Sequence, residues 1–292
     1  MTGIFSGVIT AMITPFKDGK VNFDALGKLI DYQIEGGTDA LVILGTTGEP
    51  STMTEAEKEE TIRYSIKKAA GKIKIIVGVG SNDTSKAVAA AERAEKMGAD
   101  GVLAVTPYYN KCTQRGIFEY YSAICNATKL PVIAYNVPLR TGVNILPETA
   151  EKLTVLSNLA GIKEASGNMA QVCETMRRVR GKIDIFSGED GLNLPILAIG
   201  GAGVVSVLSN VAPKQVKEVY SLVKAGNSDR ANELQDSLLP LIDALFIEVN
   251  PIPVKAACNM LGFEAGIPRP PLTELEEEHK KVLLNELRKV VK

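Results

Sequence analysis

The sequence predicts an α/β protein, a (β/α)8 TIM barrel with a C-terminal helical extension. Its 292 residues are enough for one large barrel. Short runs rich in valine, isoleucine and alanine alternate with helix-length amphipathic stretches, which is typical of βα units around a buried parallel sheet. There are eight such runs, on average about 28 residues apart, a spacing that suits a βα unit. Eight such repeats close a barrel.

The strands are expected in the most apolar short runs. In chain order these are Gly7–Thr10, Ala40–Leu44, Lys74–Gly78, Gly101–Val105, Val132–Tyr135, Leu159–Lys163, Ile183–Phe186 and Gly203–Val207. The uncharged segment 191–212 is long enough to span a bilayer. Because Gly200-Gly-Ala-Gly203 divides it into a helix-length piece and a strand-length piece, we interpret it as buried core.

Local signals mark the helices. Thr54 opens a capping box, Asp83 precedes an alanine-rich helix expected at 86–97, and Pro147 and Pro213 stand where first turns should begin. After the last strand, helical segments are expected over the ranges 213–225, 228–248 and 251–291. The first of these completes the eighth βα unit. We therefore assign residues 1–225 to the barrel and residues 226–292 to a helical extension packed on it.

A doubly wound open sheet is the competing architecture. Its nucleotide-binding fingerprint is missing, because Gly78-Val-Gly80 continues as Ser-Asn-Asp without the third glycine. The sequence therefore favours the barrel.

Composition argues against several classes of function. Lysine and arginine total 33 against 34 acidic residues, so the net charge of -1 gives no electrostatic footprint for nucleic acid. The four cysteines form no Cys-x-x-Cys pair, which indicates neither a disulfide framework nor a zinc site. The first ten residues lack the basic region and long apolar core of an export signal, and no membrane anchor motif occurs, so we expect a cytoplasmic location.

The charged run 274–281, with the single histidine His279, is interpreted as a solvated helix face without a catalytic role. No metal and no cofactor are expected.

Lys163 is the most informative residue of the chain. It ends an apolar stretch that begins at Asn158, where burial would remove the hydration of its ammonium group. Burial lowers the pKa of a lysine by up to several units, and a neutral amine attacks carbonyl groups. The alternative interpretation is a lysine that extends into solvent or pairs with Glu164.

Other reactive side chains also follow predicted strands, and in such a barrel the chemistry lies at the carboxyl ends of the strands. Thr46 and Thr47 follow the second strand, Tyr135 ends the fifth, and Arg140 comes shortly after it. A tyrosine held by a threonine hydroxyl can shuttle protons during imine formation, the threonines can bind the carboxylate of a keto acid, and Arg140 offers a fork for a second carboxylate. Taken singly, Tyr135 could be a core residue, the threonines could finish a strand and Arg140 could be solvated. Their coincidence at one rim favours imine chemistry.

These residues resemble the motifs of the pyruvate-dependent Schiff-base aldolases and lyases, and within them the dihydrodipicolinate synthase family. The resemblance covers nearly the whole chain. The motifs that carry it are Gly45-Thr-Thr-Gly-Glu49, Thr106-Pro-Tyr-Tyr-Asn110, Tyr135-Asn-Val-Pro138, Arg140-Thr-Gly142, Gly161-Ile-Lys-Glu164, Ser187-Gly-Glu-Asp190 and the segment 245–255.

The resemblance implies an activity and a catalytic set. Pyruvate would condense with L-aspartate 4-semialdehyde through a lysine Schiff base to give 4-hydroxy-tetrahydrodipicolinate in lysine and diaminopimelate biosynthesis. Lys163 would form the imine and Tyr135 would relay protons. Thr46 would couple Tyr135 to Tyr109 of a neighbouring subunit. A homotetramer built from two tight dimers is the implied assembly.

The resemblance also implies the substrate-binding residues. Thr47 would hold the carboxylate of pyruvate, and Arg140 would receive the carboxylate of the aldehyde. The backbone near Gly188 and Val205 would shape the pocket. Leu139 replaces a glycine that is common in the family, so it is expected to alter the loop that aims Arg140.

A second departure concerns feedback by lysine. Lysine-inhibited members of the family resemble one another in carrying histidines after the Gly-Thr-Thr-Gly-Glu motif and a glutamate after the Gly-x-Gly-x-Asn segment. This chain has Glu55, Lys58 and Lys86 in those places. Since Lys86 would repel the amino group of the effector, we expect weak or absent inhibition by lysine.

Two rival functions stay open at this point. Another pyruvate lyase, such as an N-acetylneuraminate lyase or a keto-deoxy-sugar-acid aldolase, would share the imine but take a sugar aldehyde; Arg140 and the paired threonines favour the amino-acid substrate. A sensor that kept the barrel and lost its chemistry is the rival of another class. The intact Lys163, Tyr135 and Thr46 argue against it.

Overall fold

The computed structural model describes residues 2–291 and contains a closed barrel of eight parallel strands. The strands follow one another around the barrel in chain order, as β1, β4, β5, β6, β7, β8, β9 and β10. All eight coincide with the predicted runs to within one residue at each end, which is inside the usual uncertainty of an element boundary. The predicted (β/α)8 barrel is confirmed. By their internal contacts the residues divide into two compact units, Met1–Gly7 with Ile75–Val205 and Val8–Lys74 with Ser206–Lys292.

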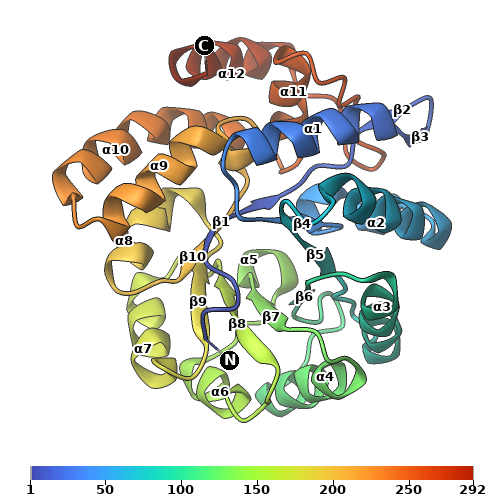
Figure 1. Ribbon diagram of the computed structural model, residues 1–292, viewed down its shortest axis with the longest axis vertical. Coiled ribbons are helices and arrows are strands. Elements are labelled where there is room, and N and C mark those ends of the chain that lie inside the picture. The colour runs from blue at the N-terminus through green and yellow to red at the C-terminus, as the bar shows by residue number, and fades with distance from the viewer. Residues whose placement is uncertain (1, 292) are drawn as a thin grey trace. The chain divides into compact units, whose positions relative to one another are not determined.

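The first unit contains six strands with the helices that connect them. Its elements are β5 (Lys74–Gly78), α3 (Thr84–Met97), β6 (Gly101–Val105), α4 (Gln114–Ala127), β7 (Val132–Asn136), α5 (Pro138–Thr141), α6 (Pro147–Leu153), β8 (Leu159–Glu164), α7 (Met169–Val179), β9 (Asp184–Ser187), the 3-10 turn η3 (Asp190–Leu192), α8 (Asn193–Ala198) and β10 (Gly203–Ser206). Figure 1 shows α3, α4, α6 and α7 on the outside of these strands. The strands are buried almost throughout, because the helices cover one face and the barrel interior covers the other.

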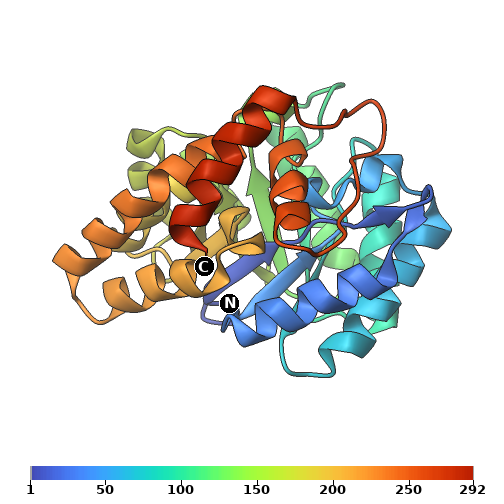
Figure 2. The same ribbon diagram turned by 90° about the horizontal axis from the view of Figure 1, so that it is seen from above.

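The second unit contains the first two barrel strands and the C-terminal helices. Its elements are β1 (Gly7–Ala11), the hairpin strands β2 (Phe16–Lys17) and β3 (Lys20–Val21), α1 (Phe23–Glu35), β4 (Ala40–Ile43), the 3-10 turns η1 (Thr46–Gly48) and η2 (Pro50–Thr52), α2 (Glu55–Ala69), the 3-10 turn η4 (Leu208–Asn210), α9 (Pro213–Lys224), α10 (Ser228–Leu245), α11 (Ile252–Met260) and α12 (Glu277–Val290). The C-terminal helix α12 packs against α10 and α11, as Figure 2 shows.

The local signals for helix starts act as predicted. The hydroxyl of Thr54 accepts from the backbone N–H of Glu57, and the Glu57 carboxylate accepts from the backbone N–H of Thr54, which makes a complete capping box. Asp83 caps α3, and Pro147 and Pro213 occupy the first turns of α6 and α9. The uncharged segment 191–212 contains α8 and β10, as expected.

The prediction of one helical segment over residues 251–291 was wrong, because the structure has two helices there. Helix α11 ends at Met260, and α12 begins only at Glu277. Between them Gly262 adopts a left-handed φ of 85°, and three prolines follow at positions 268, 270 and 271. A glycine in this conformation ends a helix, and closely spaced prolines disfavour a new turn of helix after it.

The division of the chain at residue 225 into barrel and extension stays a prediction. Among residues 2–291, none of the helices combines the length and the apolar character that crossing a membrane requires.

Candidate active site

Lys163 and Tyr135 form the centre of the candidate site, and both belong to the first unit. They are register partners on the neighbouring strands β8 and β7. Partners in register point to the same face of a sheet, and here the Nζ of Lys163 lies 4.2 Å from the centroid of the Tyr135 ring. Both residues are buried, with exposed fractions of 5% and 7%. The interpretation of Lys163 as a lysine that extends into solvent is therefore excluded.

Burial changes the proton affinity of the amine. It lowers the pKa of Lys163 to about 8; the nearby carboxylate of Asp190 opposes this decrease, while the positive charge of Arg140 adds to it. With such a pKa about one amine in ten is neutral at pH 7, against about one in a few thousand for an ordinary lysine. The site thus presents a usable nucleophile near neutral pH.

Tyr135 has the opposite perturbation. Burial raises the pKa of its hydroxyl to about 12, and the positive charge of Arg140 partly counteracts the increase. The hydroxyl therefore keeps its proton at neutral pH and is able to donate it. An amine that releases its proton readily beside a phenol that retains its own is a suitable pair for an addition to a carbonyl group.

Gly188 makes room for the lysine side chain. It directly follows β9, and its backbone N–H donates to the carbonyl oxygen of Glu164 at 2.8 Å. A Cβ atom at position 188 would lie 2.9 Å from both Cγ and Cε of Lys163 and 2.9 Å from Cβ of Ala165. Only glycine leaves Lys163 undisturbed here, because such contacts are shorter than van der Waals packing allows.

Val205 is buried in β10. Phe186 of β9 is the register partner of both Lys163 on β8 and Gly203 on β10. Since side chains alternate along a strand, Val205 faces the same side of the sheet as Lys163.

Arg140 stands on the short helix α5, directly after β7, and its side chain is exposed. The neighbouring Thr141 is buried and fixes this segment: its hydroxyl interacts with the carbonyl oxygens of Val137 and Val143 and with the hydroxyl of Thr106. The side chain of Leu139 is 90% exposed.

A polar cluster behind the reactive pair was missed by the sequence analysis. Asn136 and Glu164 are the next register partners after Tyr135 and Lys163, and the amide of Asn136 donates to the Glu164 carboxylate at 3.0 Å. The backbone N–H of Ser166 donates to the same carboxylate at 2.8 Å. Burial raises the pKa of Glu164. Strand alternation could have revealed this cluster, because the residue after an inward-facing lysine must face outward.

The threonines lie in the second unit. Thr46 is exposed and Thr47 is buried, and both belong to the 3-10 turn η1 that follows β4. The side-chain amide of Asn250 donates to the hydroxyl oxygen of Thr47 at 3.0 Å. Asn250 was not singled out from the sequence, although it lies in one of the motifs quoted above.

Tyr109, which belongs to the first unit, is not part of the buried group around Lys163. Its side chain is 91% exposed, and its backbone has a left-handed φ of 71°. Few non-glycine residues adopt this conformation, and those that do are concentrated at functional sites.

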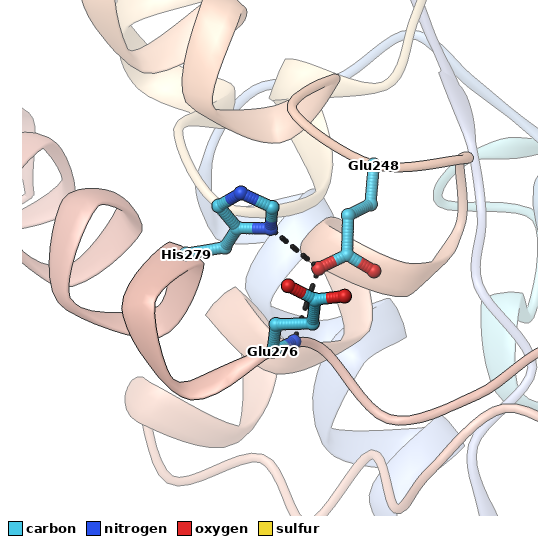
Figure 3. Close-up of side chains that lie close together, drawn as sticks. All are labelled: Glu248, Glu276 and His279. Carbon is cyan, nitrogen blue, oxygen red and sulfur yellow. Dashed lines mark hydrogen bonds and ion pairs between the residues drawn. The ribbon is translucent and has the colours of Figure 1, made fainter.

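His279 has a contact that its charged sequence context did not indicate. Its Nδ1 lies 2.7 Å from Oε1 of Glu248, which also accepts from the backbone N–H of Glu276 at 3.0 Å (Figure 3). Potential ligand atoms of these three residues lie within 4.8 Å of one another. Since Glu276 is the N-cap of α12, the carboxylate of Glu248 satisfies a backbone donor at a helix N-terminus. His279 is half-buried, so it is less solvated than the acidic residues of its charged run.

A closed (β/α)8 barrel with a buried lysine amine against a tyrosine at adjacent strand ends defines a class, the barrel proteins that carry a reactive lysine. Residues 4–290 match the model of the dihydrodipicolinate synthetase family, and the chain belongs to this family.

Individual relatives agree with this assignment. The chain is 52% identical over 286 residues to a protein of Alkaliphilus oremlandii named 4-hydroxy-tetrahydrodipicolinate synthase, covering 98% of this chain and 99% of that protein. It superposes on a crystal structure of dihydrodipicolinate synthase from Thermotoga maritima with a TM-score of 0.97 at 44% identity, covering 99% of both chains. It is also similar to the chloride inhibited dihydrodipicolinate synthase from Acinetobacter baumannii complexed with pyruvate, with a TM-score of 0.95, 40% identity and 98% coverage of both chains.

Proposed function

We propose that this chain is a lyase that condenses pyruvate with L-aspartate 4-semialdehyde to give 4-hydroxy-tetrahydrodipicolinate in lysine and diaminopimelate biosynthesis. The observation that carries the proposal is the buried Lys163 amine beside Tyr135. The family and the names of its relatives supply the substrates.

The first stage is formation of an imine. The neutral Nζ of Lys163 attacks the C2 carbonyl of pyruvate, and the hydroxyl of Tyr135 protonates the developing oxygen. The carbinolamine loses this oxygen as water to give the imine. Loss of a proton from the methyl group then gives an enamine, which is the carbon nucleophile.

The second stage joins the two substrates. The enamine carbon attacks the aldehyde carbon of aspartate semialdehyde, and the aldehyde oxygen takes a proton to become the 4-hydroxyl group. The amino group of the bound aspartate moiety then attacks the imine carbon and displaces Lys163 as a free amine. One water is released overall, and the lysine is regenerated.

We assign the remaining site residues by their likeness to the family. Thr47 holds the carboxylate of pyruvate, and Arg140 receives the carboxylate of the aldehyde, to which its planar guanidinium is well suited. The backbone around Gly188 and Val205 shapes the pocket. The close approach of Gly188 to the Lys163 side chain, which leaves no room for a Cβ atom, supports the assignment of Gly188 to the pocket.

Thr46 couples Tyr135 to Tyr109 of a neighbouring subunit in a homotetramer built from two tight dimers. The 91% exposure of Tyr109 supports this assembly, because an aromatic side chain displayed on a strained backbone is available to a second copy of the chain. Sedimentation of the wild-type chain and of a Tyr109→Ala variant tests it. A wild-type monomer with full activity would contradict it.

The choice of acceptor is tested by substrate competition. Turnover of aspartate semialdehyde is expected to exceed that of N-acetylmannosamine and glyceraldehyde by a large factor, because an exposed arginine beside the site suits a carboxylate better than a sugar hydroxyl. Preference for either sugar aldehyde would reject the proposed acceptor and leave the imine step intact.

A further inference from the structure

Glu49 and Lys255 form an ion pair that the proposed reaction does not use. The Lys255 Nζ lies 2.8 Å from Oε1 of Glu49, and the two side chains are 2% and 0% exposed. Both residues belong to the second unit and to motifs singled out in the sequence. Burial of two charges is costly unless the geometry is good and the remaining hydrogen bonds are made.

The surroundings satisfy both charges. The second oxygen of Glu49 accepts from the backbone N–H of Arg269 at 2.8 Å. The Lys255 Nζ also donates to the carbonyl oxygen of Ile267 at 3.2 Å and lies 4.2 Å from the centroid of the Phe16 ring. Each charged group therefore has at least one hydrogen bond besides the ion pair, and these additional contacts hold the ion pair in one geometry.

The ion pair connects the turn after β4 to helix α11. Glu49 ends the turn that holds Thr47, and Lys255 lies in the helix that begins just after Asn250. The same two segments meet a second time where Asn250 donates to the hydroxyl oxygen of Thr47. Two contacts between the same two segments fix the orientation of the turn relative to the helix, whereas a single contact would let the turn rotate about it.

The turn needs such a constraint. Leu44 and Glu49, the residues on either side of Gly45–Gly48, have left-handed φ values of 61° and 55°. Side-chain-bearing residues in this region cost roughly 1–3 kcal/mol each and persist only where the surroundings enforce them. The carboxylate of Glu49 is anchored on two sides, so it can hold the strained end of the turn in place.

We propose that Glu49 and Lys255 are positioning residues that set the direction of the Thr47 hydroxyl, through the Asn250 hydrogen bond, toward the carboxylate of the keto acid. A hydroxyl has one donor and two acceptor sites. Since Asn250 donates to the oxygen, the hydroxyl proton points elsewhere and is available to a bound carboxylate. The inference rests on the proposed role of Thr47.

The test separates substrate binding from turnover in Glu49→Gln, Lys255→Met and Thr47→Val. In each variant the KM for pyruvate is expected to rise roughly tenfold to a hundredfold, the range for one hydrogen bond to a charged group, with little change in kcat or in the KM for the aldehyde. The combination of Thr47→Val with Lys255→Met is expected to raise the KM no further than Thr47→Val alone, because both changes remove the same interaction.

Two further variants keep the test independent of folding. The double variant Glu49→Gln with Lys255→Met leaves no unpaired buried charge, and such replacements are often tolerated. It is expected to show the same rise in the KM for pyruvate. Lys217→Met is the matched control: it removes a less buried ion pair with Asp39 in the same unit and is expected to lower thermal stability without raising either KM.

Three results would overturn the inference. A raised KM for pyruvate in Thr47→Val together with wild-type values in Glu49→Gln, Lys255→Met and their double variant would refute the positioning role and leave the proposed function standing. Full additivity of Thr47→Val and Lys255→Met would do the same. Failure of the wild-type chain to form any covalent adduct with pyruvate would refute the proposed function and the inference together.

Discussion

Tyr135 and Lys163 are register partners on β7 and β8, with the lysine amine 4.2 Å from the centre of the tyrosine ring. The pairing of the two strands is enough to place both side chains on one face, so the sheet, and not a loop, positions the reactive pair. A slip of one residue in this register would turn one of the two side chains to the opposite face.

Removal of the Tyr135 hydroxyl tests its role as a proton relay. Tyr135→Phe retains the ring that packs on Lys163 and is expected to lower kcat by roughly 10²–10⁴-fold, the usual contribution of a positioned acid or base. The control is Tyr121→Phe, which removes a buried hydroxyl bonded to the carbonyl oxygen of Ala104 at 3.0 Å in the same unit. Steady-state rates that fall equally in both variants would assign the loss to packing.

The pH dependence of imine formation follows from the lowered pKa of Lys163. Only the neutral amine attacks pyruvate, so the rate is expected to rise with pH and to level off above about 8. Because the carboxylate of Asp190 raises the pKa of Lys163, Asp190→Asn is expected to shift this profile to lower pH. Stopped-flow rates of imine formation between pH 6 and pH 10 measure both profiles. A shift to higher pH in Asp190→Asn would contradict the electrostatic account.

The clearance at Gly188 predicts a large effect of one added methyl group. Gly188→Ala would place its Cβ 2.9 Å from two atoms of the Lys163 side chain and is expected to slow imine formation at least tenfold, roughly the effect of a 1.4 kcal/mol increase in the barrier. Gly191→Ala is the matched control, because nothing lies within 4 Å of the Cβ that it would add. Equal rates of imine formation in the two variants would show that Lys163 has room to spare.

Inhibition by lysine is expected to be weak or absent. Glu55 and Lys58 form an ion pair with each other at 2.8 Å, and Lys86 presents an exposed positive charge on α3. A cationic effector meets repulsion from Lys86. The measurement is initial velocity at saturating substrates with increasing L-lysine, and half-maximal inhibition at submillimolar concentration would refute the prediction.

Much of the fold could be predicted because its signals are local. Strands buried on both faces appear as short apolar runs, and Thr54, Asp83, Pro147 and Pro213 mark helix starts by chemistry that depends on three or four neighbouring residues. The break between α11 and α12 was also visible in principle, since three prolines within four residues, at 268, 270 and 271, remove several helical hydrogen bonds at once and disfavour a continuous helix.

The site was predictable only in part. Lys163 and Tyr135 stand at the ends of strands, so the barrel itself brings them to adjacent positions. The contacts of Asn250 with Thr47 and of Lys255 with Glu49 join residues more than two hundred positions apart. No periodicity or local motif encodes such a pairing. It becomes visible only when the chain is folded.

The most direct test of the central claim is reduction with borohydride in the presence of pyruvate, followed by mass spectrometry of the intact chain and of its peptides. The account predicts one reduced pyruvate adduct per chain, located on Lys163 and absent from a Lys163→Met variant. An adduct located on Lys255, which is also buried, or no adduct at all, would contradict it.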